Sequence, residues 1–380
     1  MAGMLTPVNQ AQEQPASGGA VPFLVGSSKY REAPFYTSTL TMGATQQTFT
    51  PVPQITPGNF LNGVVIEVTS ASGVLGTTAT VNSYGALAIL NPISLVDTAG
   101  GEILYPLGAF EYAMAQKWLR PWDGDPQKRS NYSNTINPTF TLRFSVAIRD
   151  TLCILSNTDA RTQYRVNLVL APLTALVSVT TGVTAPAVTV NMYLDAWAEP
   201  DAVDLSGRSI EPLPPGLGAS RFLMHETQTW NAGNNTFKLT LTGNEIRALL
   251  LIFRDSTGAL KDLTDANAGV ITFRLDNRRI WTMYQSQIRE EMEAFYDRWY
   301  GGGAAAGAAT AGYTRETGVY VIPRFRDFLG GEFWLPTVEQ TLLQIELQGG
   351  DLGTNAPGTL EILYDQLAVA GQLPAELEGI

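Results

Sequence analysis

The sequence predicts an all-β protein built from two tandem eight-stranded jelly-roll barrels, each with one flanking helix. Three observations predict this fold. Short segments rich in Val, Ile, Thr and aromatic residues recur along the chain, clusters of Gly, Pro, Asn and Asp separate them, and the order of segments in the first half returns in the second. A jelly roll of eight strands fits a repeating unit of roughly 160 residues. No strand–helix alternation indicates a parallel sheet, so a doubly wound nucleotide-binding fold is not expected.

The 380 residues are too many for one ordinary core. We expect an N-terminal arm at 1–34, a first jelly roll at 35–200, a linker at 201–220, a second jelly roll at 221–370 and a C-terminal tail at 371–380. The arm is polar and rich in Pro, Gly and Ala, which is typical either of a disordered tail or of a segment that orders against neighbouring subunits. The linker combines prolines and glycines without periodicity.

In the first half, strands are predicted at 60–68, 93–96, 139–148, 165–170 and 188–197. Several of these segments alternate apolar with polar residues, as a sheet with one buried face requires. One helix is predicted at 107–119, because Leu107, Phe110, Met114 and Trp118 fall on one helical face.

The second half repeats this order. Gly58-Asn59 before the first strand matches Gly243-Asn244, segment 93–97 matches 272–276, and a helix is predicted at 284–299. Strands at 319–325, 342–347 and 359–364 then correspond to 139–148, 165–170 and 188–194. The difference in residue number between matched positions of the two halves decreases from 185 (Gly58 to Gly243) to 171 (Val188 to Thr359). A common order with a slowly changing offset indicates a duplicated unit. The alternative is two unrelated β domains of similar composition.

Composition excludes several classes of function. The 24 basic and 35 acidic residues give a net charge of −11, which argues against a protein that grips phosphate backbones. A single cysteine, Cys153, forbids an intramolecular disulfide, and a single histidine, His225, forbids a two-histidine metal site. No run of 18 apolar residues and no basic, apolar leader occur. We therefore expect a soluble protein made in a reducing compartment.

Motifs that carry chemistry are missing from the sequence. It has no P-loop, G-x-S-x-G, H-E-x-x-H or EF-hand pattern. The Gly/Ala run at 301–312 follows a helix instead of opening one, so it indicates a flexible loop and not a phosphate cradle. We predict no catalytic, cofactor-binding or metal-binding residues, no cofactor, and no enzymatic activity.

A few residues still allow a functional interpretation. His225 alternates with Leu223 and Thr227, which favours a histidine on a strand face or at a trimer interface over a catalyst. Two tryptophans and two acids form a loop that could bind a sugar or a cation, or could be a turn anchored by the aromatic rings: Trp118, Trp122, Asp123 and Asp125. One charged helix side is predicted to face solvent or a subunit, and it comprises Glu290, Glu291, Glu293, Arg289 and Arg298.

The repeated pattern resembles a known family. The strand G-x-F-L-x-G-V-V-I-E-V at 58–68, the element I-x-L-x-D-x-x-G at 93–100, a helix and further strands, all repeated after a Pro-rich linker, resemble the double jelly-roll major capsid proteins of tailless icosahedral, tectivirus-like phages. The resemblance covers roughly residues 35–370. The second copy departs from it at one turn, where Asn277-Arg278-Arg279 replaces the glycine-containing sequence after Asp97.

The resemblance implies a capsid protein that assembles as a pseudo-hexagonal homotrimer and tiles an icosahedral virion shell. It further implies neighbouring capsomers, vertex (penton) proteins and minor capsid proteins as partners, contact of the N-terminal arm with an internal membrane or its proteins, no direct nucleic-acid binding, and synthesis in the host cytoplasm before incorporation into the virion. Two alternatives stay open. One is a phage receptor-binding or carbohydrate-binding β-sandwich protein that uses Trp118 and Trp122, and the other is a hydrolase that uses Asp123 and Asp125.

Overall fold

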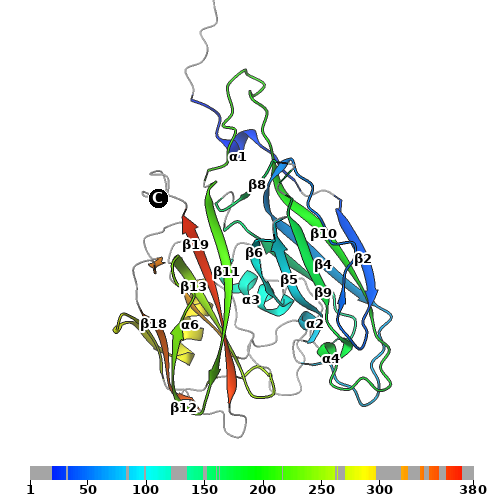
Figure 1. Ribbon diagram of the computed structural model, residues 1–380, viewed down its shortest axis with the longest axis vertical. Coiled ribbons are helices and arrows are strands. Elements are labelled where there is room, and N and C mark those ends of the chain that lie inside the picture. Colours follow the sequence, from blue (N-terminus) through cyan, green and yellow to red (C-terminus); the bar gives the residue numbers. More distant parts are fainter. Residues whose placement is uncertain are drawn as a thin grey trace, which may run out of the picture.

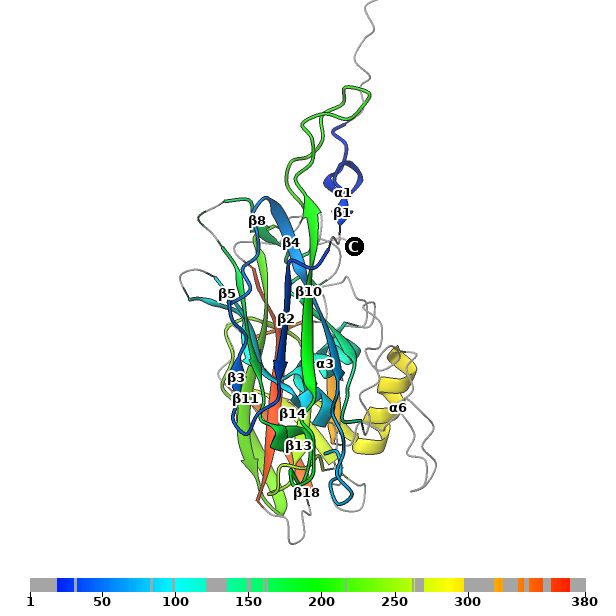
Figure 2. The ribbon, with the colours of Figure 1, turned by 90° about the vertical axis from the view of Figure 1, so that its right-hand side faces the viewer.

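The computed structural model describes residues 19–30, 33–82, 85–97, 100–120, 135–148, 152–159, 161, 163–215, 217–261, 263, 270–296, 318–323, 334–337, 342–350 and 357–369. Within these residues the strands form four antiparallel sheets, arranged as two barrels side by side (Figure 1). A view turned by 90° shows an elongated molecule with a hairpin that projects from one end (Figure 2). No helix in these ranges is long and apolar enough to cross a membrane.

The first barrel comprises ten strands and four helices of the described chain: β1 (Lys29–Tyr30), β2 (Tyr36–Thr41), β3 (Gln47–Thr48), β4 (Asn59–Ala71), β5 (Leu90–Val96), β6 (Glu102–Leu107), β7 (Phe140–Ser145), β8 (Leu155–Asn157), β9 (Arg165–Leu170) and β10 (Ala187–Ala198), with α1 (Phe23–Gly26), α2 (Gly85–Ala88), α3 (Ala109–Leu119) and α4 (Leu173–Leu176). One sheet has the order β1-β10-β4-β7, in which β2 also pairs with β10 and β8 with β4. The other has the order β3-β9-β5-β6.

The second barrel follows in the same way: β11 (Ala219–Trp230), β12 (Gly233–Leu239), β13 (Glu245–Arg254), β14 (Val270–Leu275), β15 (Arg278–Tyr284), α6 (Gln285–Tyr296), β16 (Val319–Pro323), β17 (Leu335–Pro336), β18 (Leu343–Gly350) and β19 (Gly358–Val369). Its sheets have the orders β11-β19-β13-β16, with β17 on β13, and β12-β18-β14-β15.

Apart from the short strand β1, each described strand of the first barrel has a counterpart with the same pairing in the second, which confirms the predicted all-β fold and explains the sequence repeat. β4 and β13 are central strands of equivalent sheets, β10 and β19 flank them, and β6 and β15 each end a sheet beside a helix. Gly58 and Gly243 stand directly before the central strands with φ of 106° and 111°. Both need a backbone conformation that side chains disfavour, so the same turn residue appears twice.

The structure also corrects the sequence interpretation in places. Strands β1, β2, β3 and β12 were not predicted, and a further unpredicted strand, β6 or β15, precedes each helix. Segment 201–220 is more than a connector. Val203 bridges Ser209 in a hairpin, and Ile210 bridges Val21 in the N-terminal segment. Residues 29 and 30 of the expected arm pair with β10, so this part of the arm is held by its own chain.

The core explains why the helices sit where they do. Buried apolar side chains of both barrels form one continuous cluster. Helix α3 was predicted to have one apolar face, but the structure buries it on nearly all sides, Gln116 and Lys117 included. It lies between the barrels in Figure 1, where each side meets protein. Helix α6 has one buried side, with Ile288 and Met292, and packs on β16.

Each barrel buries a carboxylate opposite a β-bulge in its central strand. In the second barrel the extra residue of β13 is Arg247, and in the first barrel the extra residue of β4 is Asn62. Asp365 binds Arg247 Nη1 at 2.7 Å and Arg221 Nε at 2.6 Å, with all three side chains almost fully buried. Asp195 accepts from Asn62 Nδ2 at 2.8 Å and lies 3.5 Å from Lys29 Nζ. The bulge thus aims a polar side chain at the acid in both copies.

We predict that Asp365→Asn is far more destabilising than Asp195→Asn. Loss of the Asp365 charge leaves Arg221 and Arg247 as buried cations, which costs about 3–5 kcal/mol. The Lys29 side chain is 42% exposed, so its ammonium can regain water when Asp195 is neutralised. Urea and thermal unfolding of both variants measure the difference. Equal losses of stability would contradict this account.

Candidate functional site

The described chain offers no catalytic constellation. It contains no group of three or more His, Cys, Asp and Glu residues that could hold a metal ion. Cys153 is fully buried, and burial raises the pKa of its thiol to about 12. A thiol with that pKa is almost never a thiolate at neutral pH, so Cys153 is not a nucleophile in the folded protein.

Of the residues in the alternative interpretations, Trp118 lies in the described part of the chain. Trp118 has no exposed surface and its ring lies beneath the Lys117 ammonium, 4.9 Å from the ring centre, so it cannot form a sugar-binding platform. Trp122, Asp123, Asp125 and the run 301–312 lie outside the described residues.

The charged side of the second helix is only partly as predicted. Glu290 and Glu291 are exposed, as a helix side facing solvent requires. Arg289 is buried instead, and its Nη2 donates to Tyr320 Oη at 2.9 Å. The side chain of Glu293 and the whole of Arg298 lie outside the described part of the chain.

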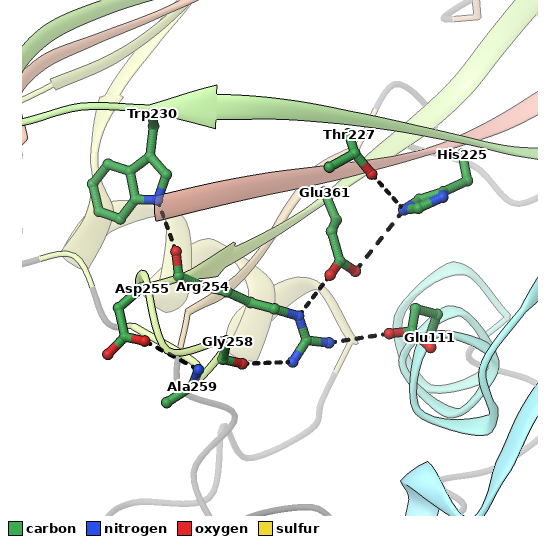
Figure 3. Close-up of polar contacts among 9 residues, drawn as sticks. All are labelled: Glu111, His225, Thr227, Trp230, Arg254, Asp255, Gly258, Ala259 and Glu361. Atoms are coloured by element: carbon green, nitrogen blue, oxygen red, sulfur yellow. Dashed lines mark hydrogen bonds and ion pairs between the residues drawn. The ribbon is translucent and has the colours of Figure 1, made fainter. Parts of the chain in front are cut away.

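The best-defined polar cluster lies at the junction between the two barrels (Figure 3). Arg254, at the end of β13, donates from Nε to Glu361 of β19 at 2.6 Å and from Nη2 to Glu111 of helix α3 at 3.1 Å. Its guanidinium also lies over the Phe110 ring at 5.4 Å. Because Glu111 and Phe110 belong to the first barrel, this one arginine ties the two barrels together. We call Arg254, Glu111, Glu361 and His225 the junction cluster.

His225 lies on a strand face, as predicted, and that face meets the first barrel of its own chain. Its Nε2 is 3.9 Å from Glu361 and 3.4 Å from Thr227 Oγ1, and its ring centre is 6.5 Å from that of Tyr105 on β6. His225 is therefore part of the packing between the two barrels and not of a catalytic arrangement.

Burial controls the ionisation of the junction cluster. It raises the pKa of Glu111 above its ordinary value, and the nearby Glu361 carboxylate adds to the rise, whereas Arg254 opposes it. Burial lowers the pKa of His225, although Glu361 acts in the other direction. One arginine thus holds two largely buried carboxylates, of which the side chains are 13% and 15% exposed, and an unpaired charge there is costly.

A second connection reinforces the junction. Arg221 of β11, already bound to Asp365, donates from Nη1 to the backbone oxygen of Ser145 at the end of β7, at 3.2 Å. Around these polar contacts the outer side of the second barrel is apolar and fully covered, with Leu250, Ile252 and Leu363 at 0% exposure. The barrels therefore form one packed body in which the second barrel presents the outer side of its β11-β19-β13 sheet to β6 and α3 of the first.

Most of this junction could not be predicted from the sequence. Glu111 lies within a predicted helix and Arg254 ends β13, but they are 143 residues apart. The only available sign was the placement of charged residues, Glu111 and Arg254, at the margins of apolar segments. Which acid meets which base depends on how the two barrels dock.

We predict that Arg254→Met loosens the junction and lowers the free energy of unfolding by about 2–3 kcal/mol, because Glu111 and Glu361 then face each other without a cation. The matched control is Arg208→Met, which removes an arginine from an exposed i,i+4 pair with Asp204 and should change stability little. Differential scanning calorimetry checks both. Similar melting temperatures for wild type and Arg254→Met would contradict the role given to Arg254.

We also predict a pH dependence that belongs to His225. The folded pKa lies below the unfolded value of 6.5, so the unfolded chain binds more protons just below pH 6.5. The stability that the neutral form of His225 allows is fully present above that pH, and part of it is lost as the pH falls toward the folded pKa. The variant His225→Gln should therefore gain stability relative to wild type as the pH falls through 6.5 toward the lower folded pKa.

The pH dependence of stability that belongs to Glu111 should have the opposite sign, and the variant Glu111→Gln tests it. Because the folded pKa of Glu111 is raised above 4.5, the folded protein binds more protons in the window between these two values, and wild type becomes more stable there as pH falls. Glu111→Gln should lose stability relative to wild type in that window. Urea unfolding at a series of pH values measures both slopes, and slopes of the same sign would contradict these assignments.

Comparisons with known proteins identify solved structures that have a similar fold. No protein-family model matches the sequence, and no curated protein is similar to it. Among solved structures, the major capsid protein (MCP) of STIV, Sulfolobus turreted icosahedral virus, is similar with a TM-score of 0.58 and 14% identity, over 91% of this chain and 99% of that one. The PBCV-1 virus capsid is similar with a TM-score of 0.54 and 12% identity, over 89% and 94%. The chain therefore has the double jelly-roll fold found in these viral capsid proteins.

Proposed function

We propose that this chain is a major capsid protein, with a structural and non-enzymatic role, that self-assembles as pseudo-hexagonal homotrimers and tiles an icosahedral virion shell. The observation that supports it best is the duplication itself: two barrels of identical topology, docked side by side as one body, in the fold of known capsid proteins. Three such chains supply six similar barrels, and a threefold object with six barrels has a nearly hexagonal outline.

Other features are consistent with this proposal. Charged residues make up 16% of the chain, which suits a protein whose sides become subunit contacts. The net charge of −11 suits a shell protein that does not itself bind the genome. The expected partners are neighbouring capsomers, vertex and minor capsid proteins, and an internal membrane or its proteins reached through the N-terminal arm. Synthesis in the host cytoplasm would precede incorporation into the virion.

We predict that purified protein forms a species of roughly three times 41.1 kDa, about 123 kDa. Size-exclusion chromatography with multi-angle light scattering measures this mass, and negative-stain images of the same peak should show hexagonal outlines. A monomer that persists at every concentration would contradict the proposal, because a duplicated barrel would then have no hexagonal lattice to build.

A further inference from the structure

Two surfaces equivalent to the two sides of the junction have no partner among the residues that the structure describes. The junction joins the outer side of the second barrel's sheet β11-β19-β13 to the edge strand β6 and helix α3 of the first barrel. By the duplication, the first barrel has the equivalent sheet β2-β10-β4, and the second has the equivalent edge strand β15 and helix α6. Figure 1 shows β2 and β10 on the side of the molecule facing away from the second barrel, and β12 and β18, from the sheet of β15, on the opposite side.

Residue-by-residue equivalence shows that the first of these surfaces is open. Tyr193 pairs with Val65 as Leu363 pairs with Leu250, counted from the equivalent Asp195 and Asp365. Leu363 is fully buried against the first barrel, whereas Tyr193 is half-buried. One pair further along, Ile252 is fully buried, but its equivalent Glu67 is half-buried. Among the described residues, these positions are thus less covered on the first barrel than on the second, although Val65, the equivalent of Leu250, is itself buried at 4% exposure.

The open face is polar. We use this name for the outer side of β2, β10 and β4, with Thr37, Thr39, Glu67, Asn191 and Tyr193. Glu67 Oε2 accepts from Tyr193 Oη at 3.0 Å and from Asn191 Nδ2 at 3.5 Å, and forms no ion pair within the described chain. Among the described residues its carboxylate is therefore held in place by neutral donors.

The edge strand β15 has the complementary charge. It pairs only with β14 among the described strands, so its other side is a free edge. Arg278 and Arg279 begin it directly after a two-residue turn in which Asp276 and Asn277 have φ of 46° and 67°. Both arginines are exposed, and neither forms an ion pair with any residue that the structure describes.

The turn at Asp276 and Asn277, with the two arginines that follow it, also differs in sequence between the two copies. The equivalent turn of the first barrel, after Asp97, closes through glycines: Gly101 donates to Asp97 Oδ1 at 2.7 Å, and Gly100 has a φ of 88°. That turn has no arginine, and its edge strand β6 meets the second barrel within the chain. The second barrel, whose edge strand β15 pairs on one side only among the described strands, is therefore the barrel that carries the two arginines.

We propose that the open face of one copy of this chain receives the β15 edge of a second copy, with Arg278 and Arg279 placed against Glu67. The contact is heterologous, because two different surfaces meet, and such a contact forms a closed ring when its rotation closes. It repeats between chains the arrangement that the junction makes within one chain. This inference rests on the proposed function, since it names the contact that joins chains in the trimer.

The difference in chemistry between the two interfaces supports the assignment. The junction within the chain is apolar around one arginine, as suits surfaces that are never apart. The open face carries hydroxyl groups and the Glu67 carboxylate, and β15 begins with two exposed arginines, which suits a contact between surfaces that are first exposed to water. Free edge strands also tend to pair with other chains, and arginines on the edge restrict which partner fits.

The test is a charge exchange in the full-length protein. We expect Arg278→Glu/Arg279→Glu to raise the concentration at which the trimer dissociates by about tenfold or more, and Glu67→Lys to have a similar effect. The combined variant should recover most of the loss, because the charges are exchanged and not removed. Light scattering over a dilution series gives the dissociation midpoint, and circular dichroism confirms that each variant is folded.

Two controls make the outcomes distinct. Arg165→Glu/Arg208→Glu changes the net charge by the same amount at two other exposed arginines and should leave the trimer intact. Arg278→Gln/Arg279→Gln removes the charges without reversing them, and should weaken the trimer less than the glutamates do. If wild type and all variants form equally stable trimers, the proposed contact is wrong while the proposed function stands. If wild type is a monomer, both are wrong.

Discussion

The buried carboxylate of Asp365 is the interaction on which the arrangement of the second barrel and its docking depend. It lies on β19, binds Arg247 from the bulge of β13 and Arg221 from β11, and so fixes three neighbouring strands in register. Arg221 continues to the backbone of Ser145 in the first barrel. Two cations in a dry interior require this one anion, so strand pairing and barrel docking are coupled through a single group.

The first barrel keeps the same geometry with weaker chemistry. Asp195 occupies the place of Asp365, but its partners are the neutral Asn62 and the half-exposed Lys29 of a two-residue strand. The difference follows from where each site lies. The second barrel's acid is sealed beneath the first barrel, where charges need full compensation, whereas the first barrel's acid lies close to water that can solvate its cation. Both barrels thus keep the bulge and the buried carboxylate, but the charge on the partners of the carboxylate differs with how deeply each site is buried.

Much of the fold was predictable, because strand periodicity and repetition are local properties. The predicted strands at 165–170 and 188–197 match β9 and β10 within a residue, and the helix at 107–119 matches α3 apart from its first turn. The early strands β2, β3 and β12 were not predicted because they are short or polar on one side, so their pairing partners define them more than their composition does. The hairpin at 203–209 looked like a linker because its hydrogen bonds, and not its pattern, make it ordered.

The sequence by itself determined that this protein is a duplicated all-β chain whose one cysteine and one histidine are too few for an intramolecular disulfide or a two-histidine metal site, since residue types, spacing and repetition carry that information directly. Only the tertiary structure decided that Arg254 meets Glu111, that Asp365 holds two arginines, and that the surfaces around Glu67 and Arg278 stay open. These contacts join residues more than a hundred positions apart or depend on one barrel covering the other. Docking geometry, which no local pattern encodes, selects among the many charged pairs that the composition allows.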